Sequence, residues 1–341
     1  MEPLFRAVYH LHPEFNMNDI NIAIDRNSMG KLFDFVTNSS RAFEIDVEII
    51  GNTAVFVRRE KSVTEFITEF RGFGYTFPEE YTTWDKEVKG SSSHHRIASF
   101  CFAGMKYLLR YESDGYLAEK AGVVKKSTAP GKGADADVDS AITSLGSDGS
   151  LNIGEKQPLA QNRLAIRSQG SEIDQRAVID IKTRAAHKTL DTEIVLPRLW
   201  MSQTVNLIAA YHKGGRFDNV QVLDVRDGIE QWQKNHAVDL RKLNALMLRM
   251  ITTVKGTVSK KCRIKRAERG KLEIKELGDG HASALPEDLQ LKLQGNGDSE
   301  KYYDWDDDRG LLLSERKSEE SDKDYTACSS EVCGYCGHCR Y

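Results

Sequence analysis

The sequence of 341 residues has no long hydrophobic run and no large excess of charge of one sign. No stretch approaches the roughly 18 consecutive apolar residues of a membrane-spanning helix, so we expect no membrane span. The formal net charge of −3 gives no overall attraction to nucleic acid, so any anion-binding site must be a local patch. Residues 1–15, MEPLFRAVYHLHPEF, mix acidic and basic side chains and lack the apolar core of a signal peptide.

Cysteine is scarce over most of the chain. Cys101 and Cys262 stand alone, and the other four of the six cysteines lie in residues 328–341. A secreted disulfide scaffold does not have this distribution. With 40% hydrophobic and 29% charged residues, the composition is typical of a soluble globular protein. We therefore expect an intracellular protein, cytoplasmic or nuclear.

Three kinds of segment alternate along the chain. Residues 1–116 and 172–280 show helical and strand periodicities, and we interpret them as two parts of one folded core. Residues 117–171 are rich in Gly, Ser, Asp and Ala, which predicts a flexible insertion because little apolar area can be buried. Residues 281–327 predict an acidic irregular tail, and residues 328–341 a cysteine-rich knuckle.

Several local patterns predict individual elements of the core. Turns at residues 51–52 and 103–104 each separate two strand-like runs. Residues 196–211, LPRLWMSQTVNLIAAY, predict a helix that leads into a buried strand, and residues 63–70 predict a helix. Residues 239–256 predict an amphipathic helix with Asp239 as its N-cap and Gly256 as its stop.

Two charged doublets interrupt apolar strands. Asp180 and Lys182 lie two residues apart in AVIDIKTRAAHK, as do Glu112 and Asp114 in LLRYESDGY, so each doublet projects from one strand face. If the two strands are neighbours in one sheet, the three carboxylates converge and repel one another. Mg²⁺ or Mn²⁺ would remove that repulsion, and Lys182 would then orient water or neutralise charge on phosphorus. The alternative is two unrelated surface strand ends with ordinary charges, at one of which Asp180 and Lys182 form a structural ion pair.

The order of these doublets resembles a known family. Glu-x-Asp followed by Asp-x-Lys resembles the PD-(D/E)XK nuclease core. With FVRRE, GYTFPEEY and LWMSQTVNLIAAYHKGGRF around it, the chain resembles the decapping exoribonuclease (DXO) family, as a divergent fungal branch. Some similar chains carry the label geranylgeranyl pyrophosphate synthetase. A prenyl synthase needs two Asp-rich motifs on the helices of an all-α bundle. This chain has one Asp-rich run, at 304–308, and a high predicted β content, so we do not adopt that label.

The resemblance implies an α+β fold, with a mixed β-sheet flanked by helices. It implies metal-dependent hydrolysis at RNA 5′ ends, of decapping, pyrophosphohydrolase or 5′–3′ exoribonuclease type. The alternative is a catalytically inactive nucleic-acid-binding or scaffold protein that retains the nuclease fold.

The same resemblance assigns roles to individual residues. The metal ligands would be Glu112, Asp114 and Asp180, catalysis would also use Lys182 and Gln203, and a substrate phosphate would bind to Arg58 or Arg59. Pro78 stands where the family pattern has a glutamate after Phe77. Glu79 is the candidate replacement ligand, with Glu80 and the loss of this ligand as the alternatives.

Cysteines and basic residues form two further candidate sites. Cys328, Cys333, Cys336 and Cys339 have spacings that suit Zn²⁺, although docking with Cys101 or Cys262, an iron–sulfur site and a redox-active tail stay open. The acidic or cysteine-rich tail could bind a protein partner. The basic segment 260–275, KKCRIKRAERGKLEIK, predicts a hairpin that either follows RNA phosphates or protects a sheet edge with lysines.

Overall fold

The larger of two β-sheets forms the centre of the structure, a computed structural model that describes residues 1–37, 41–60, 73–121, 164, 166–267, 270–278 and 280–295. Its strand order is β11-β10-β2-β3-β1-β5-β4. β1 runs parallel to both β3 and β5, whereas the other pairs are antiparallel, so the sheet is mixed. The strands are β1 (Ile22–Asp25), β2 (Phe43–Ile50), β3 (Thr53–Arg59), β4 (His95–Phe102), β5 (Met105–Glu112), β10 (Lys261–Arg266) and β11 (Leu272–Glu276).

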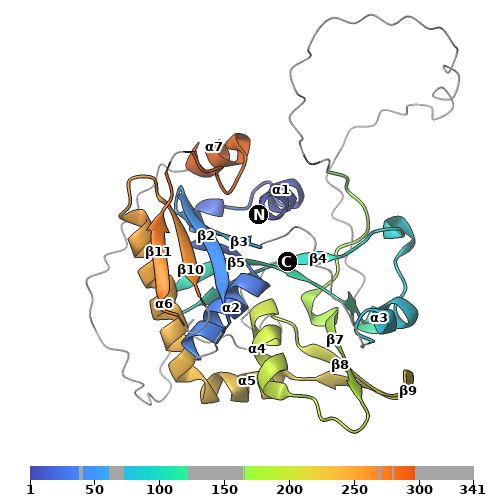
Figure 1. The fold of residues 1–341 in the computed structure, drawn as a ribbon. Coiled ribbons are helices and arrows are strands. Elements are labelled where there is room, and N and C mark those ends of the chain that lie inside the picture. The colour runs from blue at the N-terminus through green and yellow to red at the C-terminus, as the bar shows by residue number, and fades with distance from the viewer. Residues whose placement is uncertain are drawn as a thin grey trace, which may run out of the picture.

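A smaller sheet of four strands, in the order β6-β7-β8-β9, lies beside the larger one (Figure 1). Its strands are β6 (Gly115–Tyr116), β7 (Val178–Ala185), β8 (Asn206–Lys213) and β9 (Arg216–Asp224). β7 and β8 are parallel and are connected by helix α4 (Thr192–Ser202). Because β6 follows β5 after only Ser113 and Asp114, the chain passes directly from one sheet to the other at this point.

Helices cover both faces of the larger sheet (Figure 1). One face packs against α1 (Glu2–Leu11) and α7 (Glu287–Gly295), which lie together. The other face packs against α2 (Arg26–Val36), α4, α5 (Arg226–Asn235) and α6 (Ala237–Lys255). A short helix, α3 (Thr76–Tyr81), packs on one face of the smaller sheet.

The alternation of side chains along the central strands produces the two cores. Ala54 and Phe56 of β3 join the core beneath α2 and α6, whereas Val55 joins the core beneath α1 and α7. Successive side chains of a strand point to opposite faces, so a central strand covered on both sides is apolar along its length. This explains why β3 is apolar at every position between Thr53 and Arg58.

Most of the predicted elements are confirmed. The turns at 51–52 and 103–104 join β2 to β3 and β4 to β5, and segment 260–275 forms the β10–β11 hairpin. Residues 196–211 form the end of α4 and most of β8. The predicted α+β class, with a mixed sheet flanked by helices, is therefore confirmed. No helix in the described ranges is long and apolar enough to cross a membrane.

Two predictions are wrong. Residues 287–295 form α7 and are not irregular, because Leu289 and Leu293 are buried against the core of α1. Asp239 is not the N-cap of α6, because the helix already begins at Ala237 and Asp239 binds the Lys242 ammonium from the first turn, at 2.9 Å. The predicted helix 63–70, and residues 122–163 of the predicted insertion, lie outside the described residues.

Candidate active site

The Asp180 carboxylate lies buried on β7 and is 4% exposed. Its Oδ1 atom contacts the Lys182 ammonium, and its Oδ2 atom lies 3.4 Å from the Arg26 guanidinium. Asp180 and Lys182 share one face of β7, as the spacing predicts. Arg26 comes from the start of α2, so this ion-pair network joins the smaller sheet to a helix of the larger one.

Asp114 lies in the link between the sheets and meets Asp180 there. Its Oδ2 atom accepts a hydrogen bond of 2.6 Å from the backbone amide of Ile181. Burial, and next the negative charge of Asp180, raise the pKa of Asp114, although Ile181, Lys182 and Arg26 act in the opposite direction. The fold thus holds two carboxyl groups close together despite their mutual repulsion. Such perturbed carboxyl groups are common in functional sites.

Glu112 does not join this pair, and the expectation that both doublets lie on strands of one sheet is wrong. β5 belongs to the larger sheet, whereas β7 pairs with β6 and β8. Tyr111 faces the smaller sheet, because its hydroxyl contacts the Gln175 side-chain amide at 3.0 Å. Glu112, the next residue, points to the other face of β5 and lines a separate pocket.

Glu79 lies away from the carboxylate pair, and Gln203 caps the end of α4. Phe77 of α3 packs against Ile179 and Ile181, which lie on the face of β7 opposite to Asp180. Glu79, on the same helix, is exposed on that side of the sheet. Gln203 is 2% exposed, and its side-chain amide donates to the Trp200 carbonyl at 2.6 Å at the end of α4.

The adjacent residues Arg58 and Arg59 point to opposite faces of the larger sheet. Arg58 lines the pocket that also contains Glu112, and its guanidinium lies 3.2 Å from the Glu60 carboxylate. Arg59 lies on the other face, where it binds Asp46 at 2.6 Å. Arg263 also binds Asp46, at 2.7 Å, so Arg59 belongs to a structural ion-pair cluster across β3, β2 and β10. Of these two arginines, Arg58 lines the pocket and Arg59 does not.

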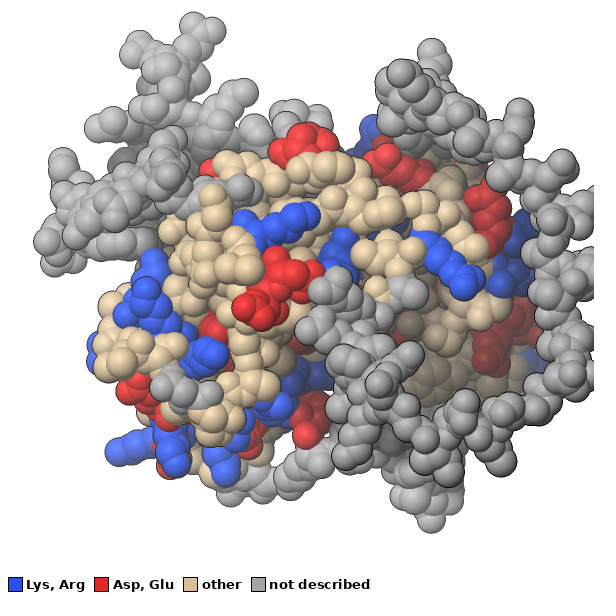
Figure 2. Space-filling model, turned by 90° about the horizontal axis from the view of Figure 1, so that it is seen from above, with Lys and Arg blue, Asp and Glu red and all other residues tan. Residues whose placement is uncertain are grey.

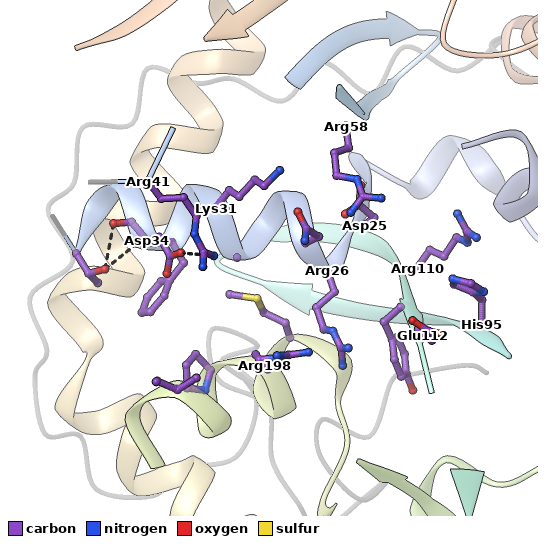
Figure 3. A pocket seen from close by; sticks show the side chains of 18 of the residues that line it. Asp25, Arg26, Lys31, Asp34, Arg41, Arg58, His95, Arg110, Glu112 and Arg198 are labelled. Atoms are coloured by element: carbon purple, nitrogen blue, oxygen red, sulfur yellow. Dashed lines mark hydrogen bonds and ion pairs between the residues drawn. The ribbon is translucent and has the colours of Figure 1, made fainter. Parts of the chain in front are cut away.

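The pocket has a volume of about 830 Å³ and lies among α2, α4, β3, β4 and β5. Figure 3 shows its basic side chains coming from separate elements: Arg26 and Lys31 from α2, Arg58 from β3, Arg110 from β5 and Arg198 from α4. Acidic side chains also line it: Asp25, Asp34, Glu112 and Glu193. Among the described residues, neither Arg110 nor Arg198 forms an ion pair.

Sequence reasoning did not identify Arg26, Lys31, Arg110 or Arg198. The signal for Arg26 was its position directly after β1, where Asp25 caps α2 by accepting from the Ser28 amide at 2.8 Å. A charged residue at a strand-to-helix junction commonly belongs to a site. Arg110 and Arg198 have no local signal, because they meet only through the tertiary fold.

The carboxylate pair fits a divalent ion only in part. Within the described ranges, no three His, Cys, Asp or Glu side chains lie together as a metal site. Mg²⁺ is, however, often bound by one or two carboxylates together with waters and substrate phosphates. Burial and the charge of Asp180 raise the pKa of Asp114, and a bound cation would reduce the repulsion between the two carboxylates. The pair therefore suits a metal site that a substrate phosphate completes.

The face seen from above in Figure 2 carries lysine and arginine interspersed with aspartate and glutamate. Neither sign covers this face, which agrees with the small net charge and leaves local pockets as the places for anions. The four candidate zinc ligands, Cys328, Cys333, Cys336 and Cys339, lie outside the described residues.

Comparisons with known proteins agree with this architecture. Residues 1–293 match the family described as Domain of unknown function (DUF8563), and no curated protein matches the sequence. Rai1 from Scheffersomyces stipitis has a similar fold, with a TM-score of 0.54 at 10% identity over 86% of this chain and 78% of that chain.

Two ligand complexes are also similar in fold. S. stipitis Rai1 in complex with (3′-NADP)⁺ and calcium ion gives a TM-score of 0.52 at 11% identity over 86% and 76% of the two chains. S. pombe Rai1 in complex with 3′-FADP gives 0.51 at 11% identity over 81% and 77%. These proteins belong to the fungal Rai1/Dxo1 decapping exonuclease family, so the predicted resemblance is confirmed at the level of the fold.

Proposed function

The chain belongs to the family described as Domain of unknown function (DUF8563) and has the fold of the Rai1 proteins, and from this premise we propose that it is a metal-dependent hydrolase acting on RNA 5′ ends. The observation that carries the proposal is the pairing of half-buried Asp114 with buried Asp180, with Lys182 beside them, at the border of an arginine-lined pocket. Arg26 connects the two features, because it lines the pocket and binds Asp180.

Asp114 and Asp180 would hold one Mg²⁺ or Mn²⁺ ion, which lowers the pKa of a bound water and neutralises charge on a phosphate. The backbone amide of Ile181 fixes the Asp114 carboxylate, so its free oxygen has a defined direction. Lys182 is bound to Asp180 and is half-buried, which holds its ammonium in position to neutralise negative charge on a substrate phosphate. Glu112, Glu79 and Gln203 are left without an assigned part in this step.

The arginines of the pocket would bind the 5′ phosphate. Arg26, Arg58, Arg110 and Arg198 are planar, always charged and suited to bidentate contacts with phosphate oxygens. Burial, and next the neighbouring Arg110, lower the pKa of His95, so His95 in the same pocket is predominantly neutral at pH 7 and adds no fixed charge. Nucleotide ligands in the similar Rai1 complexes support a nucleotide-type substrate.

A second candidate function is binding of RNA 5′ ends without hydrolysis. One observation favours it: both oxygens of Asp180 are already held by cations of the chain, Lys182 and Arg26. A divalent ion must displace at least one of these contacts. The described residues provide no third carboxylate whose bond to the metal would compensate for the lost contact. The two functions share the pocket and differ only in whether the carboxylate pair takes up metal.

The test is incubation of the purified protein with short RNAs that differ only at the 5′ end: hydroxyl, monophosphate, triphosphate, methylated cap and NAD cap. Each is incubated with Mn²⁺ and with EDTA, and products are resolved by mass. The hydrolase proposal predicts products only with Mn²⁺ and only from RNA with a phosphorylated or capped 5′ end. Tight binding of phosphorylated RNA with no product under any condition supports the second candidate, and equal binding of hydroxyl and phosphorylated ends contradicts both.

A further inference from the structure

The face of the smaller sheet that carries Asp180 and Lys182 continues to a second pocket. β7, β8 and β9 are in register, so side chains in one cross-strand row share a face. The successive rows on this face are Asp180–Leu207–Leu223, Lys182–Ala209–Gln221 and Arg184–Tyr211–Asn219. Asp180, Leu207 and Ala209 are buried on this face, whereas Lys182 is half-buried and Asn219 and Gln221 are exposed, so the accessible part of the face begins at Lys182.

A pocket of about 470 Å³ lies at the other end of this surface. Tyr211, Asn219 and Gln221 of the rows above line it, together with Lys188 of the β7–α4 loop and Lys213 at the end of β8. Strands are about 4.8 Å apart, so Gln221 is about 10 Å across the sheet from Lys182. The pocket thus begins two strands away from Lys182.

We propose that this second pocket is a subsite for the RNA chain that follows the 5′ end. The inference rests on the proposed function and extends it from the terminal nucleotide to the body of a single strand. The 5′ phosphate would occupy the arginine-lined pocket, and the carboxylate pair would lie between the two pockets. The downstream nucleotides would pass from Lys182 over the exposed side chains of Gln221 and Asn219 on β9.

The chemistry of the pocket suits single-stranded RNA. Lys188, Lys213 and Arg216 contribute positive charge, and Asp218 is the one carboxylate that lines the pocket, 2.8 Å from Arg216. Lys188 and Lys213 have no ion pair with any described residue and are exposed. Single strands are bound by basic grooves with aromatic side chains on which bases stack, and by amides that reach base edges. Tyr211, Asn219 and Gln221 supply the aromatic ring and the amides.

The surface of the smaller sheet is a better candidate for this path than the basic hairpin β10–β11. That hairpin is on the larger sheet, and its Arg263 is committed to Asp46 and Glu44. Its lysines at 265 and 275 are exposed, but neither lines either of the two pockets described above. They provide a control with the same change of charge at a distant place.

The experiment measures binding of 5′-phosphorylated RNA with EDTA present, so that hydrolysis does not occur. Fluorescence anisotropy gives the affinity for a labelled octanucleotide, and competition with AMP gives the affinity of the terminal pocket. The variants are the double substitution Lys188→Gln/Lys213→Gln, the single substitution Tyr211→Ala, and the control Lys265→Gln/Lys275→Gln. All of these except Tyr211 are exposed, so melting curves should coincide with that of the wild type.

The wild type should bind the octanucleotide more tightly than AMP. The double variant should keep its affinity for AMP and lose octanucleotide affinity, with the salt dependence of binding reduced by about 0.7 for each lost phosphate contact. Tyr211→Ala should weaken octanucleotide binding about tenfold, because a stacked base is lost. The control variant should match the wild type.

Three results would overturn the subsite. They are equal affinity for AMP and octanucleotide in the wild type, equal losses for both ligands in the double variant, or an equal loss in the control variant. The first of these leaves the proposed 5′-end function standing. If instead the double variant loses octanucleotide affinity but the wild type never hydrolyses RNA with Mn²⁺, the subsite stands and the hydrolase proposal fails.

Discussion

Asp180→Asn should destabilise the protein and Asp114→Asn should not, although both replace a carboxylate with an amide of the same shape. Asp114 is held against Asp180 at an unfavourable cost, which its raised pKa reports. Asp180 is the partner of two cations. Asp114→Asn removes a repulsion, and Asp180→Asn removes the compensating charge of Lys182 and Arg26.

The expected magnitudes follow from these contacts. In Asp114→Asn the amide oxygen still accepts from the Ile181 amide, at the loss of about 1 kcal/mol for a weaker hydrogen bond. Removing the charge of Asp114 stabilises the folded state at neutral pH by about 1.4 kcal/mol for each unit by which the pKa of Asp114 is raised. The variant should therefore be as stable as the wild type or slightly more stable. Breaking a buried ion pair costs about 3–5 kcal/mol, and Asp180→Asn should lie near the lower end because Lys182 and Arg26 are partly exposed.

The pH dependence gives a second readout. A carboxyl whose pKa is higher in the folded protein than in the unfolded chain contributes stability at low pH and loses it as the pH rises. Wild type should therefore lose stability relative to Asp114→Asn as the pH rises above 3.8, the unfolded value, and through the raised folded pKa.

Urea unfolding across this pH range, with and without Mn²⁺, is the assay. Mn²⁺ should stabilise the wild type by mass action and both variants much less. Two findings would refute this reasoning: an Asp114→Asn protein several kcal/mol less stable than wild type at neutral pH, or an Asp180→Asn protein as stable as wild type.

Three other predictions concern neighbouring features. Arg58→Ala should lower the affinity for AMP about tenfold without changing the melting temperature. Arg59→Ala should leave AMP binding intact and lower the free energy of unfolding in urea by about 1 kcal/mol. The reverse pattern would mean that Arg59 binds the ligand and Arg58 stabilises the fold. Hydrogen bonds from Arg263 and Arg59 outweigh burial and lower the pKa of Asp46, so stability should fall as the pH drops below 3.8, and Asp46→Asn should lack that part of the acid sensitivity in pH titrations of unfolding. Leu293→Ala should cost about 2–5 kcal/mol in urea unfolding, and a cost near zero would mean that α7 does not stabilise the core.

Local patterns in the sequence predicted most of the fold. Turn residues, helical periodicity and apolar strands are local properties, so the hairpins, α4, β8 and α6 could be read directly. α7 was missed because its two buried leucines are meaningful only once α1 lies beside them. The distribution of strands between two sheets was also missed, since β5 and β6 are separated by two residues and no pattern marks the change of sheet.

The candidate site was predicted in part for the same reason. The spacing of Asp180 and Lys182 on one strand fixes their shared face, and that part is confirmed. The meeting of Asp114 with Asp180 depends on the link between sheets, and the exclusion of Glu112 depends on Tyr111 taking the face towards the smaller sheet. Arg26 reaches Asp180 from 154 positions away in the chain, a separation that no local pattern can bridge.

Manganese binding by the carboxylate pair is the most direct measurement of the central claim. Electron paramagnetic resonance of free Mn²⁺, titrated against the protein in the presence of a 5′-phosphorylated dinucleotide, gives the number and affinity of bound ions. The account predicts one site in the wild type that is lost in both Asp114→Asn and Asp180→Asn and retained in Glu112→Gln. No bound ion in the wild type, or a site that both aspartate variants keep, would contradict it.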